Sequence, residues 1–234
     1  MDAGAPSRIS RHSTSERIVN LSQIKHIIFD CDGVLIDSEI LANQVEVEIK
    51  TLLGFPITLE EQIKNFAGCG LSHPRVKAEL ERLPKEYLKL VDERCHQIYN
   101  KELKAISGVV ELLEQLKISV CVASSSEPDW LDRKLKLTNL KRFFPDAIFH
   151  GRLVQKSKPE PDLFLHALKT LDWHAEDCLV VEDSEHGVKA GKAAGAKVCG
   201  FLGGAHIYPG HADRLFKAGA DYLIFDIQNV LGLV

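Results

Sequence analysis

Six short apolar segments constrain the fold of this chain more than any other feature of its sequence. They are nearly continuous hydrophobic runs rather than alternating ones, which is typical of strands covered on both faces, as in a parallel sheet. The predicted strands span residues 24–30, 118–124, 147–150, 178–183, 196–201 and 222–225.

Helical segments lie between the later strands, and we expect them over residues 108–116, 130–137, 161–171, 185–194 and 211–218. Strands and helices that alternate at this spacing predict an α/β fold with a doubly wound, Rossmann-like parallel sheet. The chain has 234 residues, which is room for one domain or two small ones.

The interval between the first and second predicted strands breaks this alternation. It contains no strand-like run, and Leu41, Val45 and Ile49 recur there at helical spacing. Thr58 and Glu61 form a capping box that predicts the start of a second helix.

A further helix of this interval is expected to open at Pro84, a residue that suits the first turn of a helix. We therefore predict an all-helical cap domain over residues 38–105, inserted after the first strand of an α/β core formed by residues 21–37 and 106–234. Ligands of open α/β sheets bind at the carboxyl ends of the strands, so the cap is expected to act as a lid over a site.

Composition argues against several classes of partner. The formal net charge is −4, from 29 Lys and Arg against 33 Asp and Glu, so we expect neither nucleic acid nor an anionic membrane as a partner.

Residues 1–20 lack periodicity and an apolar run, which predicts a disordered tail and a cytoplasmic protein without a secretory signal. The six cysteines form no C-x-x-C pair, and we expect free thiols.

The first predicted strand ends in Asp30-Cys31-Asp32-Gly33. Residues two apart on a strand point to the same side, so Asp30 and Asp32 are expected to face one spot. Two close carboxylates need a cation between them, or one must be protonated and serve as an acid. Both explanations stay open, as does a turn with two solvated aspartates.

The fourth predicted strand ends in a second acidic pair, Glu182-Asp183, followed by Ser184. Oxygen ligands from several loops suit Mg²⁺, which binds one or two carboxylates together with a substrate phosphate. The alternative is that Asp183 is the N-cap of the next helix.

The second predicted strand ends in Ser124, Ser125 and Ser126, and Lys158 begins the segment KPEPD, which two prolines stiffen. Hydroxyl and backbone N–H groups at the start of a helix, with a lysine, can hold an anion. Taken singly, the serines suit a turn and the lysine a solvated surface. One phosphate and one Mg²⁺ would satisfy these groups and both acidic pairs at once.

Four segments resemble those of the haloacid dehalogenase superfamily of phosphotransferases, in the branch with a helical cap. They are FDCDGVLIDSE (29–39), VASSS (122–126), KPEPD (158–162) and VVEDSEHG (180–187). The resemblance extends over about residues 24–226. It is strongest to sugar-phosphate phosphatases of the 6-phosphogluconate phosphatase and β-phosphoglucomutase-like group, which commonly act as monomers on small phosphomonoesters.

The resemblance implies a role for each matching residue. Asp30 would be the nucleophile that forms an aspartyl-phosphate, and Asp32 the general acid and base. Mg²⁺ would be bound by Asp30, the backbone carbonyl of Asp32 and Asp183, with Glu182 nearby. The phosphoryl oxygens would be held by Ser124, the N–H of Ser125 and Lys158.

Alternatives to a phosphatase remain. β-Phosphoglucomutases have a histidine where this chain has Ala42 and an arginine where it has Leu71, so the mutase is the less favoured reading. A phospho-receiver-like binding module would lack both the cap and the acid Asp32, and a dehalogenase would not need Asp32.

Specificity is expected to come from the cap. Ser72, His73 and Arg75 lie in the loop that would reach the leaving group, and Glu39 lies near the entrance. They are candidates to bind hydroxyl groups or a carboxylate. Alternatively, Ser72 caps the next helix, Arg75 lies on its exposed face and Glu39 forms an ion pair in the hinge.

Overall fold

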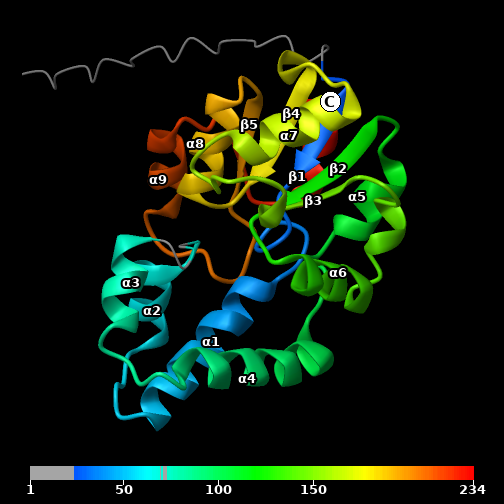
Figure 1. Ribbon diagram of the computed structural model, residues 1–234. Helices are drawn as coiled ribbons and strands as arrows, with labels where there is room; N and C mark the ends of the chain where they lie inside the picture. The colour runs from blue at the N-terminus through cyan, green and yellow to red at the C-terminus, as the bar shows by residue number, and fades with distance from the viewer. Residues whose placement is uncertain (1–23, 69, 71–72) are drawn as a thin grey trace, which may run out of the picture.

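The computed structural model describes residues 24–68, 70 and 73–234, and its centre is a parallel sheet (Figure 1). Within these residues the sheet has six strands in the order β3-β2-β1-β4-β5-β6, and every neighbouring pair is parallel. The strands are β1 (His26–Phe29), β2 (Ser119–Ser124), β3 (Ile148–His150), β4 (Cys178–Glu182), β5 (Lys197–Phe201) and β6 (Tyr222–Ile224). The predicted doubly wound sheet is confirmed.

The strand register brings the functional motifs to one edge of the sheet. Phe29, the last residue of β1, pairs with Val122 of β2 and Val181 of β4. The residues that follow these positions therefore lie side by side at the carboxyl ends of three neighbouring strands. The strand order reverses at β1, and this is the place in an open α/β sheet where ligands bind.

The sheet separates two hydrophobic cores. Along β1, Ile27 and Phe29 are buried in one core and Ile28 in the other, which explains why the strands are continuous apolar runs. Helices α5 and α6 pack in the first core, and α7, α8 and α9 in the second. Their bounds are α5 (Val109–Gln115), α6 (Pro128–Leu137), α7 (Asp162–Leu171), α8 (Glu185–Ala193) and α9 (His211–Ala218).

Between β1 and α5 the chain forms the cap, which comprises α1 (Ser38–Leu52), α2 (Leu59–Phe66), α3 (Pro74–Leu80) and α4 (Tyr87–Glu102). Figure 1 shows these helices together below the sheet. A third hydrophobic cluster holds them, with Val45 of α1 and Tyr99 of α4 among its buried residues. The capping box of Thr58 and Glu61 is present at α2.

One helix start differs from the prediction. α4 begins at Tyr87, whose N–H donates to the carbonyl of Pro84. Pro84 therefore lies in the turn that precedes the helix, because its carbonyl closes this turn.

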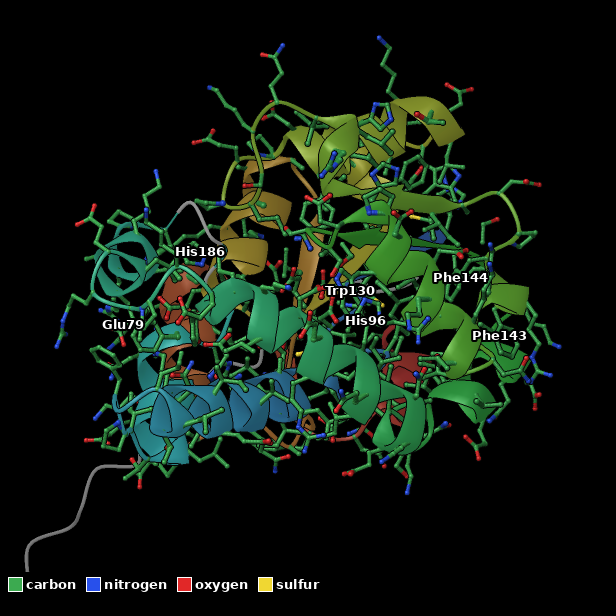
Figure 2. All side chains as sticks on the ribbon, turned by 60° about the horizontal axis from the view of Figure 1, so that its bottom comes forward. Glu79, His96, Trp130, Phe143, Phe144 and His186 are labelled. Carbon is green, nitrogen blue, oxygen red and sulfur yellow. The ribbon has the colours of Figure 1, made fainter. Side chains whose placement is uncertain are left out.

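The cap contacts the core at two ends. At one end Trp130 of α6 lies against His96 of α4, with ring centroids 4.1 Å apart (Figure 2), and its Nε1 donates to Asp92. At the other end His186 of α8 lies 3.3 Å from the carbonyl of Gly68. The cap is therefore supported on both sides of the space above the sheet edge.

Four short 3₁₀ helices complete the regular structure of the described residues: Lys141–Phe143, Gly151–Leu153, Ala175–Asp177 and Ile227–Leu233. None of the helices in the described ranges has the length and apolar character needed to span a membrane. Five of the cysteines are described, and all are free and buried. The predicted tail, residues 1–20, lies outside the described residues.

Candidate active site

Asp30, Lys158 and Glu182 form the centre of the site. The ammonium of Lys158 lies 2.6 Å from Asp30 Oδ1 and 2.7 Å from Glu182 Oε1, and it also donates to the carbonyl of Ala123. The side chain of Lys158 is only 5% exposed, so the solvated lysine considered from sequence is excluded. Lys158 thus holds together the ends of β1, β2 and β4.

Burial and charge act on this cluster in opposite directions. Burial raises the pKa of Asp30 well above its ordinary range, Lys158 opposes this, and Glu182, Asp183 and Asp32 raise it further. Burial alone would lower the pKa of Lys158, but Asp30 and Glu182 raise it above its ordinary value. The sheet edge therefore carries more acidic groups than its cations neutralise, which favours binding of a further cation.

Glu182 is held on both of its oxygens. Its Oε2 accepts hydrogen bonds from the N–H and the hydroxyl of Ser184, while Oε1 contacts Lys158. A Cβ at Gly187 would lie 1.7 Å from Glu182 Oε1, so the first turn of α8 needs glycine there. Ser184, and not Asp183, is the N-cap of α8, because its hydroxyl accepts from the N–H of Gly187.

Asp32 lies in a separate network of donors. The hydroxyls of Ser38 and Ser126 and the ammonium of Lys134 donate to its carboxylate, and Ser124 Oγ is 3.4 Å away. Burial raises the pKa of Asp32, but Lys134 and the hydroxyl donors outweigh burial and bring the pKa below 3.8. The two aspartates of the motif therefore lie in different environments, and the turn with two solvated side chains is excluded.

Asp183 is held by two histidines. His206 Nε2 lies 2.8 Å from Asp183 Oδ2, and His211 Nε2 lies 2.6 Å from the Asp183 carbonyl. Gly33 has a φ of +79°, and a Cβ there would lie 2.0 Å from Asp183 Oδ2. The glycine of the first motif thus lets the carboxylate of the fourth approach β1 closely.

Ser124, the last residue of β2, and the two serines that follow it line a cavity of about 550 Å³ above this edge, together with Asp30, Asp32 and Lys158. Ser124 is buried, and its hydroxyl accepts from the N–H of Ser126, which fixes the loop. Ser125 is exposed toward this space. The two serines predicted to hold phosphate, like Lys158, thus line the same cavity as the aspartates.

The predicted specificity residues of the cap take different places. Glu39 and His73 line the large cavity. Arg75 lines a smaller cavity of about 220 Å³ on the Asp183 side, and it donates to the carbonyl of Asn65. His73 is the N-cap of α3, and Ser72 lies outside the described residues.

The donors fit Mg²⁺ by their chemistry. Asp30 and Asp183 are buried, all-oxygen donors at one strand edge, and Glu182 lies behind them. In the described part of the chain no three Asp, Glu, His or Cys side chains converge as a ready metal cluster. With these two carboxylates alone, a Mg²⁺ ion would need further oxygen ligands, such as the Asp32 backbone carbonyl, water and substrate oxygens.

Sequence reasoning missed Lys134, His206 and His211. Lys134 has a detectable signal, because it occupies the buried stripe of α6 between Leu131 and Leu135, where a lysine is unexpected. The two histidines come after β5, and residues that follow the carboxyl end of a strand are expected near the ligand site, so their position is also a usable signal.

Comparisons with known proteins agree with this geometry. A model of the haloacid dehalogenase-like hydrolases matches residues 27–201. The 6-phosphogluconate phosphatase of Escherichia coli K12 is 32% identical over 193 residues, which cover 81% of this chain and 87% of that protein. The phosphorylated carbohydrates phosphatase of Thermotoga maritima is 32% identical over 215 residues, which cover 88% of this chain and 97% of that protein.

A solved structure agrees as well. A conserved haloacid dehalogenase-like protein of unknown function from Agrobacterium tumefaciens has a TM-score of 0.83 and 36% identity, covering 90% of this chain and 97% of that chain. Family match, relatives and fold thus lead to the assignment that the four motifs suggested. This chain belongs to the haloacid dehalogenase-like hydrolases.

Proposed function

We propose that this chain is a Mg²⁺-dependent phosphatase that hydrolyses a small phosphorylated sugar or related metabolite through an aspartyl-phosphate. The observation that carries the proposal is that both carboxylates of the first motif line one cavity together with Ser124 and Lys158. Asp30 lies beside Lys158 at the floor of the cavity, whereas Asp32 lies among hydroxyl donors and Lys134. The named relatives support the activity, because they are phosphatases of carbohydrate phosphates.

In the proposed first step an oxygen of Asp30 attacks phosphorus, and the bond to the leaving oxygen breaks. Asp32 is deprotonated in the free site, because its donors lower its pKa, so the proton for this step enters with the monoanion of the phosphomonoester. Asp32 passes this proton to the leaving oxygen, and the alcohol departs. In the second step Asp32 takes a proton from water, the water oxygen attacks phosphorus, and inorganic phosphate leaves Asp30. The proton on Asp32 departs with the phosphate, and both aspartates thus return to their initial state.

Charge neutralisation is the main task during this transfer. Lys158, Ser124 and the N–H of Ser125 would bind the phosphoryl oxygens, and Glu182 keeps Lys158 in place. Mg²⁺, when bound by Asp30, Asp183 and the Asp32 carbonyl, would supply positive charge beside the phosphoryl group. The cap would exclude water while Asp30 is phosphorylated.

The test is release of inorganic phosphate from a panel of phosphomonoesters, with Mg²⁺, with chelator and with Asp30→Asn. The panel includes hexose phosphates, 6-phosphogluconate, phosphoglycolate and pseudouridine 5′-phosphate. Release that needs Mg²⁺ and is lost in Asp30→Asn supports the proposal. Isomerisation of a glucose phosphate without phosphate release would instead favour a mutase, and no turnover of any ester would favour a binding protein. The monomeric state and the cytoplasmic location stay predictions.

A further inference from the structure

One face of cap helix α1 forms the wall of the cavity opposite the nucleophile. Glu39, Ala42, Asn43 and Glu46 line the cavity, and their spacing of three and four residues places them on the same side of the helix. A leaving group that extends from a phosphate at Asp30 toward the cap therefore meets two carboxylates and an amide.

Glu46 is fixed before any substrate arrives. Gln62 Nε2 lies 2.6 Å and Tyr87 Oη 3.1 Å from the same oxygen of Glu46, Oε2. Among the described residues no hydrogen bond reaches its other oxygen, Oε1, and Glu46 is half-buried in the cavity wall. Oε1 is thus a preorganised acceptor, which suits a hydroxyl group of a ligand.

A buried chain of polar contacts holds Gln62 in turn. Lys50, which is 1% exposed, donates to Gln62 Oε1 at 2.9 Å and pairs with Glu79 at 3.2 Å. The ammonium of Lys50 also lies 4.3 Å from the centre of the Phe66 ring. The network joins α1, α2, α3 and α4 behind the wall, so the orientation of Glu46 is set by the whole cap.

The charges that line the cavity are unfavourable for an acidic leaving group. Among the described residues of the cap, no lysine or arginine lines it. Lys158 already pairs with Asp30 and Glu182 on the floor. Glu39 adds a second carboxyl group to the wall. Burial raises its pKa to about 7, although His206 opposes this, so Glu39 repels an acidic leaving group mainly above pH 7.

The apolar residues that line the cavity suit the C–H groups of a polyol chain. The ring of Phe66, the methyl group of Ala42 and the ring of Pro74 give apolar surface between the polar groups. Lys50, Gln62 and Tyr87 already compensate part of the charge of Glu46, which reduces its need for a cationic partner. An uncharged, hydroxyl-rich chain matches both kinds of surface.

The geometry points to a substrate whose leaving group is an uncharged polyol, with its hydroxyl groups read by Glu39, Asn43 and Glu46, and not a sugar acid. This inference rests on the proposed phosphatase function and narrows its substrate class. A carboxylate placed at this wall would face two acidic side chains, which disfavours binding.

Two esters that differ at one carbon test the inference. Glucitol 6-phosphate and 6-phosphogluconate share the same chain and phosphate, but the end of the chain is a hydroxymethyl group in the first and a carboxylate in the second. We expect kcat/KM to be at least about tenfold higher for glucitol 6-phosphate, because like charges at short range are costly. The affinities of both esters for Asp30→Asn, measured by calorimetry, should differ in the same direction.

Variants connect the preference to the wall. Glu46→Gln and Glu39→Gln keep the shape of the side chain and remove its charge, so each should lower the ratio of the two kcat/KM values by about threefold or more. Glu48→Gln is the matched control, because Glu48 lies on the same helix but is exposed and pairs with Arg94. It should leave the ratio unchanged.

The outcomes separate the two proposals. Equal kcat/KM values for the two esters, or a higher value for 6-phosphogluconate, overturn the inference. The end of the substrate away from the phosphate would then be expected in the smaller cavity with Arg75. A higher kcat/KM for glucosamine 6-phosphate, which carries a cationic amino group, than for glucitol 6-phosphate overturns the inference that the leaving group is uncharged. If no ester, including p-nitrophenyl phosphate, releases phosphate, the proposed function fails, and the affinities for Asp30→Asn still decide which leaving group the wall prefers.

Discussion

His206 Nε2 lies 2.8 Å from Asp183 Oδ2, and the side chains of both residues are almost completely buried. Burial lowers the pKa of His206, but the hydrogen bond and the charge of Asp183 outweigh it and raise the pKa to about 9. The loop after β5 thus orients one carboxylate at the carboxyl end of β4. A residue that orients a metal ligand usually affects metal affinity as much as it affects packing.

We expect His206→Ala to weaken Mg²⁺ binding by about 10- to 100-fold, the usual cost of losing a partner of a metal ligand. His206→Gln keeps a donor and should restore part of the affinity. The Mg²⁺ dependence of the melting temperature, together with calorimetry, measures this without turnover. His174→Ala is the control, since His174 is exposed on the 3₁₀ turn before β4. Tighter Mg²⁺ binding in His206→Ala would show that the imidazolium competes with the metal.

Lys134 is predicted to act as a positioning residue for Asp32. Its ammonium contacts Asp32 and Ser126 from α6, and it does not line the cavity. Lys134→Met should lower kcat/KM for an alkyl phosphate by about 10- to 100-fold, because small displacements of a catalytic group have effects of this size. Loss of the buried ammonium should also lower the free energy of unfolding, because Asp32 stays buried without its ion pair.

Leaving-group dependence separates positioning from general loss of structure. p-Nitrophenolate departs without a proton, so kcat/KM for p-nitrophenyl phosphate should fall less than for an alkyl phosphate. Lys134→Arg keeps the charge and should recover part of the activity. An equal fall for both esters would contradict the positioning role.

Much of the fold could be predicted because burial on both faces leaves a local signal. β1 and β4 are apolar at successive positions, and the motifs that follow them meet because parallel strands end at one edge. The specific division of tasks between Asp30 and Asp32 came from a family resemblance and stays a prediction. The structure shows only that Asp30 pairs with Lys158 and Asp32 with Lys134.

The remaining contacts could not be predicted, because they join residues that are far apart in the sequence. A lysine in a helix usually lies in solvent, and only the packing of α6 against the sheet brings Lys134 to Asp32, 102 positions away. Glu46 and Tyr87 meet through the arrangement of cap helices, which periodicity does not define. Local sequence patterns predict helices, strands and the ends of strands. Contacts between side chains of different elements become visible only in the tertiary structure.

Burial is expected to make the described thiols unreactive. It raises the pKa of Cys178 and Cys199 to about 12, and that of Cys95 to about 12 with help from Glu46 and Asp92. In a Cys69→Ser variant, the five remaining cysteines should therefore react slowly with Ellman's reagent at pH 8, and all five should react at once in denaturant. A thiol that reacts within seconds in the native variant would contradict the packing around it.

Glu46 provides a test of whether a charge is kept at the expense of stability. Burial raises its pKa above 4.5, although Lys50, Tyr87 and Gln62 oppose this. The folded state therefore holds the proton more tightly than the unfolded state, and stability decreases as the pH rises from about 4.5 through the raised value. Glu46→Gln removes this titration, so its melting temperature relative to that of the native sequence should increase over the same interval and stay level above it.

At pH 8 we expect Glu46→Gln to melt about 2–4 °C higher, which corresponds to about 1 kcal/mol for a chain of this size. Near pH 4 the difference should be small, because the carboxyl group is then protonated in both states. Glu48→Gln, on the exposed side of α1, should show no such trend. If Glu46→Gln is more stable and also less selective for the polyol ester, the charge is retained for substrate recognition; a variant that is less stable at pH 8 would show instead that the carboxylate supports the cap.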